Sequence, residues 1–382
     1  MTATQHSRTV ASEESAFRGF ARAGSSIDEA WLASLLVQRR ARLGALFVKC
    51  FGRTLAARGP GLDATFMEAP GALDLERAWP AAIGQIRRAL LASPRDPHRA
   101  LVAATGLALH DAERGRAGRF EVTFERPVSF VFGGHVLPEA IAIAWESDGG
   151  HARARLVHRS TIDLVFTRDR RWRGLAEPLP FVATSRRDVA VLRSLPFSAP
   201  LPDGLVASTA TASVRDRYAE AFALVARVSP AHAPWIERAV RSLLPVATPG
   251  GKTTSSSFED LPGVVALSDA SPIVMLADAL VHEASHQHVF FLQQLGPVDD
   301  GSDEELYWSP ARGEHRPIGK ILLAYHAFVN VLGFWRACRD HGEVDPELSR
   351  RMVDAYARCC EELARPLETT RALTPIGRAL AG

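Results

Sequence analysis

Two histidines and a glutamate in the last third of the chain have the types and spacing for metal chemistry. The segment Leu280-Val-His-Glu-Ala-Ser-His contains the pattern H-E-x-x-H. On a helix, His282 and His286 lie about 40° apart around the axis, so both imidazoles share one face. Two imidazoles one turn apart are spaced to bind one metal ion. Glu283 lies beside them, as a general base for metal-bound water or as a support behind the ligands.

Two histidines do not complete a metal site, so we expect a third ligand from elsewhere in the chain. His326 is the preferred candidate, because it lies at the edge of the apolar stripe of a second predicted helix that can pack against the first. The alternative for His326 is a core histidine satisfied by a hydrogen bond. His288 lies about 200° around the helix from His286, so we expect it at the surface or behind the ligands. The other candidates lie in or after an acidic run that solvent can surround: Glu304, Glu305, Glu314 and His315.

The elements that carry these residues follow from hydrophobic spacing and from helix-terminating residues. A helix is predicted from Ser271-Pro272 to about Leu295, since Gly296-Pro297 cannot continue it. A short buried strand at 261–268 precedes this helix. An acidic loop follows it, and Pro317 opens the second helix, which continues beyond Trp335. The sequence therefore predicts a metal site on two C-terminal helices.

The rest of the chain reads as an α+β fold, with mainly helical N- and C-terminal parts around a small, mostly antiparallel β-sheet. Helices are predicted over 28–51, 81–91, 97–113, 214–246 and 345–363, and about five strands over 118–185. Four regions follow, which can form one compact domain: a disordered tail at 1–26, a helical region at 27–117, an antiparallel β region and linker at 118–205, and a helical metal-binding catalytic region at 206–382.

Composition excludes several classes of protein. The 382 residues carry 45 Lys and Arg against 43 Asp and Glu, a net charge of +2, so no nucleic-acid partner is expected. No apolar run approaches the roughly 18 residues of a membrane span, and residues 1–26 lack the apolar core of a secretion signal. Four scattered cysteines fit reduced thiols. We therefore expect a cytoplasmic protein without a membrane partner; nothing in the sequence indicates its oligomeric state.

Several segments together resemble one protein family. They are Leu261-Pro-Gly-Val-Val-Ala-Leu-Ser, Leu280-Val-His-Glu-Ala-Ser-His, Tyr307-Trp-Ser-Pro-Ala-Arg and Arg316-Pro-Ile-Gly-Lys followed by an apolar helix. This combination resembles the HExxH-motif peptide-modification proteins of bacterial ribosomal-peptide (RiPP) gene clusters. The resemblance covers about residues 250–335. In that family a histidine often follows the Arg-Pro pair after about two helical turns, a register that falls on Leu323 here, one turn before His326.

The resemblance implies an iron(II)/2-oxoglutarate-dependent oxygenase that hydroxylates the β-carbon of a side chain in a precursor peptide. Such an enzyme needs a cation for the distal carboxylate of 2-oxoglutarate, and Arg316, Arg312 and Lys320 cluster between the two predicted helices. Two alternatives stay open. One is a zinc metallopeptidase with Glu283 as general base. The other is a non-catalytic peptide-binding protein with a degenerate site.

Overall fold

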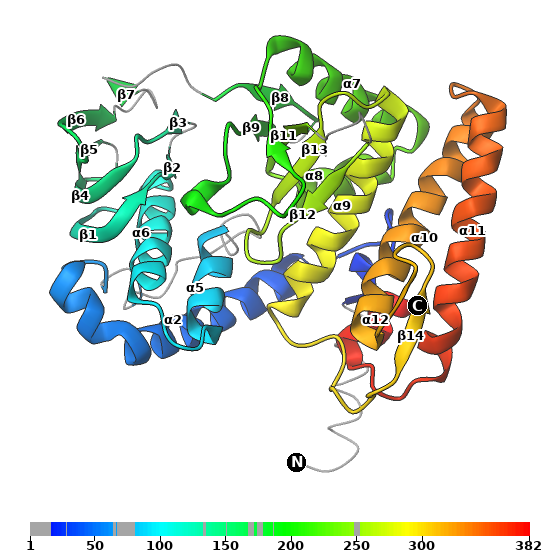
Figure 1. Ribbon diagram of the computed structural model, residues 1–382, viewed down its shortest axis with the longest axis horizontal. Coiled ribbons are helices and arrows are strands. Elements are labelled where there is room, and N and C mark those ends of the chain that lie inside the picture. Colours follow the sequence, from blue (N-terminus) through cyan, green and yellow to red (C-terminus); the bar gives the residue numbers. More distant parts are fainter. Residues whose placement is uncertain are drawn as a thin grey trace.

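The computed structural model describes residues 17–27, 29–63, 66, 81–132, 135–149, 151–166, 172–173, 179–185, 187–247 and 253–382. Helices and small sheets alternate along the chain (Figure 1), which confirms a mixed α+β architecture. The fold has a strand-rich end, formed by the first half of the chain, and a helix-rich end, formed by the last third.

The strand-rich end is an antiparallel sheet backed by three helices. These helices are α2 (Glu29–Arg58), α5 (Ala81–Leu91) and α6 (Pro97–Glu113), close to the predicted ranges. Asp96 caps α6 by accepting a hydrogen bond from the backbone N–H of Arg99 at 3.1 Å. The sheet has the order β1-β4-β5-β6-β7, and a short hairpin, β2 (Val131–Phe132) and β3 (His135–Val136), lies beside it. Its strands are β1 (Gly118–Val128), β4 (Ala140–Ser147), β5 (Ala152–Val157), β6 (Thr161–Phe166) and β7 (Trp172–Arg173).

A second, mixed sheet lies at the centre of the molecule; the sequence predicted one of its strands, the short buried one at 261–268, but not the sheet itself. Its order is β12-β13-β11-β9-β8, with β10 beside β11; the three inner strands are parallel and the two outer ones antiparallel. The predicted linker at 186–205 contributes a central strand, and the helix predicted through 246 gives way to β11, so both predictions were wrong there. Short apolar runs do not distinguish a buried parallel strand from a helix. The strands are β8 (Phe181–Ala183), β9 (Asp188–Val191), β10 (Val206–Ala207), β11 (Ser242–Ala247), β12 (Ser255–Ser257) and β13 (Val264–Ser268).

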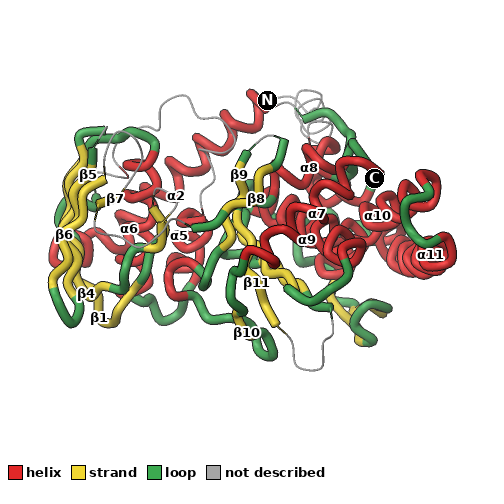
Figure 2. Tube along the Cα trace, turned by 90° about the horizontal axis from the view of Figure 1, so that it is seen from above, coloured by secondary structure: helices red, strands yellow, loops and turns green. Residues whose placement is uncertain are grey.

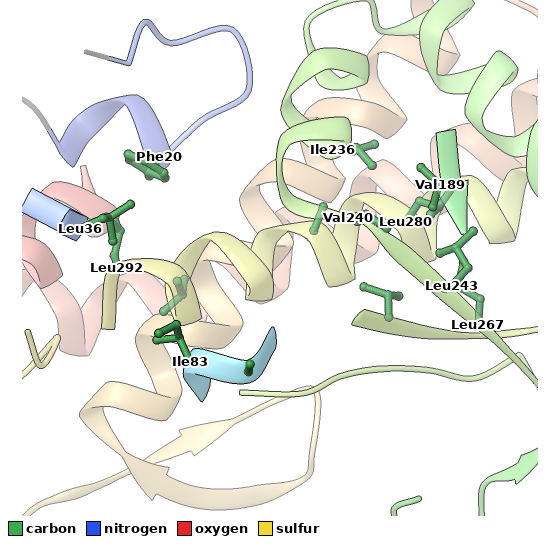
Figure 3. Close-up of a cluster of buried hydrophobic side chains, with 14 of the residues drawn as sticks. Phe20, Leu36, Ile83, Val189, Ile236, Val240, Leu243, Leu267, Leu280 and Leu292 are labelled. Carbon is green, nitrogen blue, oxygen red and sulfur yellow. The ribbon is translucent and has the colours of Figure 1, made fainter. Parts of the chain in front are cut away.

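Helix α9 (Ile273–Gln293) is the axis of the hydrophobic core. Figure 3 shows Leu280 near the middle of α9, between strand residues such as Leu243 and helix residues such as Ile236. Further along α9, the ring of Phe291 stacks on that of Phe20 from the start of the chain, with the ring centroids 5.8 Å apart. The helices α7 (Ala212–Val228) and α8 (His232–Ala239) also pack against α9. Because α9 contacts both the sheet and the helices, its exposed face is fixed in position.

The C-terminal elements form a layer of helices beside α9, at the helix-rich end of the molecule (Figure 2). They are α10 (Ile318–His341), which packs against both α9 and α11 (Pro346–Thr369), and the short α12 (Pro375–Ala381). Within the predicted acidic loop, β14 (Leu306–Ser309) and β15 (Glu314–Pro317) form a hairpin that the sequence did not predict. Among the described residues, α10 is the one helix long and apolar enough to cross a membrane, yet most of it is buried in the protein, as in an ordinary core helix.

The start of the described chain is anchored in the core. The prediction of a disordered tail at 1–26 was wrong for residues 17–26, because Phe17 and Phe20 are buried and η1 (Arg18–Phe20) forms there. Asn330 of α10 donates to the carbonyl of Ala21 at 3.0 Å and accepts from the N–H of Ala23 at 3.1 Å. Residues 1–16 lie outside the described residues.

Candidate metal centre

The two histidines of the H-E-x-x-H pattern face each other on one side of α9. The Nε2 atoms of His282 and His286 are 3.0 Å apart, and both side chains are partly buried. Nitrogen ligands lie about 2.0–2.1 Å from a bound zinc ion, so two atoms at this separation can bind one ion together. The helix holds the pair because the buried neighbours of the histidines, such as Leu280 and Ala284, pack into the core.

Burial keeps one of these histidines neutral, which is the state that binds metal. The pKa of His286 is held well below its usual value, chiefly by burial and then by the charges of His282, His326, Lys320 and Arg312. Among the described residues, its Nδ1 atom has no hydrogen-bond partner. A neutral imidazole whose Nε2 atom faces a second imidazole on a rigid helix suits a metal ligand.

Glu283 lies next to the histidine pair and is nearly fully buried. Its Oε1 atom accepts a hydrogen bond from the Ser255 hydroxyl of β12 at 2.6 Å. Within the described part of the chain, its Oε2 atom is buried without a partner. An unpaired carboxylate oxygen in a buried position is costly unless a ligand, a cation or water satisfies it.

A cavity of about 290 Å³ contains this cluster and brings the predicted cations to it. Arg312 comes from the turn of the β14–β15 hairpin, Arg316 from β15 and Lys320 from the first turn of α10. The half-buried Arg316 guanidinium lies 3.3 Å from the exposed Glu314 carboxylate on the same strand. The hairpin and the first turn of α10 therefore position three positive charges beside the two histidines.

Several residues that the sequence reasoning did not assign to the site also line this cavity, and two of them bear on its chemistry. Ser309 of β14 is fully buried, and among the described residues its hydroxyl has no hydrogen-bond partner. It belongs to the segment Tyr307-Trp-Ser-Pro-Ala-Arg, and this motif could have identified Ser309 as a residue of the site. The second is Leu323, an apolar residue that places no ligand atom in the cavity. The position marked by the family register thus faces the cavity but holds a leucine.

The structure places His326, the predicted third ligand, in the core away from this cavity. It is fully buried, and its Nε2 atom lies 2.7 Å from the carbonyl oxygen of Phe20. The α10 residues that line the cavity include Lys320, Ala324 and Phe328. His326 lies two positions from both Ala324 and Phe328, about 200° around the helix, so its side chain points away from the cavity. His326 thus has the geometry of the alternative considered for it, a core histidine satisfied by a hydrogen bond.

The remaining candidates also lie apart from the histidine pair. Among the described residues, no group of three or more His, Cys, Asp or Glu side chains is arranged to hold a metal ion. His288 is buried, not at the surface, with its Nε2 atom 3.0 Å from the Trp235 carbonyl and its ring stacked on that indole. The exposed candidates do not line the cavity: Glu304, Glu305, Glu314 and His315.

Two buried histidines make the stability of the fold depend on pH. Burial lowers the pKa of His232 to about 4 and that of His326 to about 4. Below about pH 6.5 these histidines become protonated in the unfolded chain, whereas in the folded chain they stay neutral until the pH reaches about 4. Stability is therefore complete above pH 7 and is lost as the pH falls to about 4, by about 3 kcal/mol for each histidine.

Urea unfolding of the metal-free protein at pH 7.5, 6 and 5 measures this loss. We expect His232→Gln to flatten the pH dependence between pH 7 and 5. The control His341→Gln removes an exposed histidine of α10 and keeps the wild-type slope. A wild-type protein equally stable at pH 7.5 and 5 would contradict the assignment of neutral buried histidines.

A larger cavity, of about 1070 Å³, lies between the two sheets, away from the pair His282 and His286. Its walls include Gly106 of α6, Phe132 of β2 and Ser242 of β11. It holds charges of both signs, Arg187 and Asp188 among them. Since neither histidine of the pair lines it, the chemistry suggested by the sequence belongs to the smaller cavity.

Comparison with known proteins adds no assignment. No protein-family model matches the chain, and no curated protein matches its sequence. The functional argument therefore rests on the motifs and on the geometry of the cavity.

Proposed function

We propose that this protein is an iron(II)/2-oxoglutarate-dependent oxygenase that hydroxylates a side chain of a ribosomally made precursor peptide. One observation carries the proposal: a single cavity is lined by His282 and His286 and by the cations Arg312, Arg316 and Lys320. A hydrolase needs the histidines but has no need of three cations. An oxygenase that uses a dicarboxylate cosubstrate needs the histidines for its iron and a cation for the distal carboxylate of the cosubstrate.

The residues present fit an iron ion through two imidazole nitrogens. His282 and His286 would hold it, and the bound iron would supply the one-electron and dioxygen chemistry that side chains lack. The remaining coordination positions are left to the cosubstrate and to solvent, since Leu323 offers no ligand atom. Two protein ligands hold a metal more weakly than three, so this site depends on its cosubstrate for tight binding.

The chain's own groups bind and orient the cosubstrate. Arg316 has the planar, bidentate geometry that a carboxylate prefers, and the buried Ser309 hydroxyl can donate to the same group. Arg312 and Lys320 are exposed and add long-range attraction for the dicarboxylate. Phe290 and Phe328 line the cavity and limit the entry of water.

The proposal is tested on protein purified without oxygen and loaded with iron(II). With 2-oxoglutarate and air we expect succinate, and a gain of about 16 Da in the substrate peptide without cleavage of its chain. Short peptides encoded beside the gene are the substrates to test. Protein that binds neither iron nor 2-oxoglutarate would favour the non-catalytic alternative.

A zinc metallopeptidase is the second candidate, favoured by Glu283. Its buried, unpaired Oε2 atom lies in the same cavity as the histidine pair, where a general base for a metal-bound water is required. Cleavage of casein by zinc-loaded protein without 2-oxoglutarate, abolished in Glu283→Gln, would rank this candidate first.

Substitution of Arg316 tests the cosubstrate site. We expect Arg316→Ala to raise the Kd for 2-oxoglutarate at least about tenfold, because a charge-assisted hydrogen bond contributes roughly 1.5–3 kcal/mol. Titration calorimetry on iron(II)-loaded protein under nitrogen measures the change. Arg339→Ala removes the same charge from an exposed position near the end of α10 and should change the Kd less than twofold. An unchanged Kd in Arg316→Ala would move the carboxylate to Arg312 or Lys320.

A further inference from the structure

Among the described residues, no strand covers the outer edge of β12, and this edge lies at the candidate metal centre. This strand ends the order of the central sheet, and within the described residues only β13 pairs with it. Proteins usually protect such edges with lysines, prolines or bulges. Ser255, Ser256 and Ser257 provide none of these, and their small side chains leave the edge open to another chain.

The register with β13 shows which backbone groups face outward. The N–H of Ser268 donates to the carbonyl of Thr254 at 2.9 Å, so these two residues form a hydrogen-bonded pair. Pairs alternate along an antiparallel ladder, which makes Ser256 the next residue bonded to β13. The N–H and C=O groups of Ser255 and Ser257 therefore point away from β13, toward the free edge.

The same strand is fixed against the histidine-bearing helix. The Ser255 hydroxyl bonds the Glu283 carboxylate of α9, so the side chains of Ser255 and Ser257 face α9. All three serines line the cavity that contains His282 and His286. A strand added at this edge would run past the metal-binding pair.

We propose that the substrate peptide binds in extended form by pairing its main chain with the free edge of β12. The inference rests on the proposed peptide substrate and names the way it is held. Main-chain pairing recognises an extended backbone largely independently of its sequence. Residues opposite Ser255 and Ser257 direct their side chains toward α9, and their neighbours point the other way. Every second side chain of the peptide thus faces the cavity, so only every second residue of the bound segment can be modified.

The test uses peptides selected on the wild-type protein from a displayed library of random twelve-residue sequences. Fluorescence anisotropy then gives the Kd of the labelled peptides for two variants. Ser257→Pro removes one outward N–H without breaking a bond to β13, and should raise the Kd at least about tenfold. Ala183→Pro removes an outward N–H from β8 at the opposite edge of the same sheet, and should leave the Kd unchanged.

A second measurement needs no variant of the protein. Methylation of each backbone nitrogen of the best peptide in turn should weaken binding to wild-type protein at every second position. Equal affinity for Ser257→Pro and wild type, a methylation pattern without alternation, or a selection that enriches no binder would overturn the proposal. So would a dimer of this chain that Ser257→Pro dissociates, since a second copy would then occupy the edge.

Metal content and the Kd for 2-oxoglutarate are measured on the same samples. If wild-type protein binds both metal and 2-oxoglutarate but the peptides bind Ser257→Pro as tightly as wild type, edge pairing alone is refuted. If wild-type protein binds neither metal nor 2-oxoglutarate but the methylated peptides still show the alternating pattern, the oxygenase is refuted and the peptide site stands.

Discussion

Replacing either histidine of the pair should abolish stoichiometric metal binding without unfolding the protein. His282→Ala and His286→Ala each leave one imidazole, and among the described residues no group of three or more His, Cys, Asp or Glu side chains is arranged to hold a metal ion. Loss of one of two protein ligands should lower the affinity for iron(II) or zinc by at least about a hundredfold. Elemental analysis after gel filtration in buffer that contains 2-oxoglutarate measures the bound metal, and circular dichroism follows the fold.

The matched control for this experiment is Leu323→Ala. Leu323 lines the same cavity from α10 but carries no donor atom, so the variant should keep the metal content of the wild type. Unchanged metal content in both histidine variants would remove the site from the cavity. Metal lost equally in Leu323→Ala would show that the cavity tolerates no change of shape, and that the histidine results do not report ligation.

Replacing His326 should have the opposite signature: metal retained and stability lost. Its buried ring bonds the Phe20 carbonyl, which holds the start of the described chain against α10. His326→Ala leaves a cavity and an unpaired carbonyl, which should lower the free energy of unfolding by about 2–4 kcal/mol. Urea unfolding measures this loss, and elemental analysis should find the wild-type metal content.

The loss of stability in His326→Ala should be accompanied by easier local opening of the first described residues. Limited proteolysis of His326→Ala should cut near Phe20 faster than in wild type, because local opening becomes easier. Asn330→Ala, which removes the hydrogen bonds to Ala21 and Ala23, is the matched comparison and should open the same segment. Loss of metal in His326→Ala with normal stability would restore this histidine as a ligand.

Local signals in the sequence determined the elements that carry the site. Residues four apart on a helix share a face whatever surrounds them, so the H-E-x-x-H pattern alone predicted the facing pair His282 and His286. Long periodic segments with proline at one end likewise predicted α9 and α10. These features depend on backbone geometry and near neighbours in the chain.

Only the tertiary structure decided which further residues join the pair. The rotation of α10 is set by its packing against α9 and α11, and this packing turns Leu323 into the cavity and His326 into the core. The hairpin that carries Arg316 and the edge strand of three serines depend on pairing partners that sequence periodicity does not show. Buried parallel strands such as β9 are too short for a period to identify. The sequence by itself thus determined the helix face that carries His282 and His286, while long-range packing determined which residues lie beside it, because packing free energy depends on residues distant in the chain.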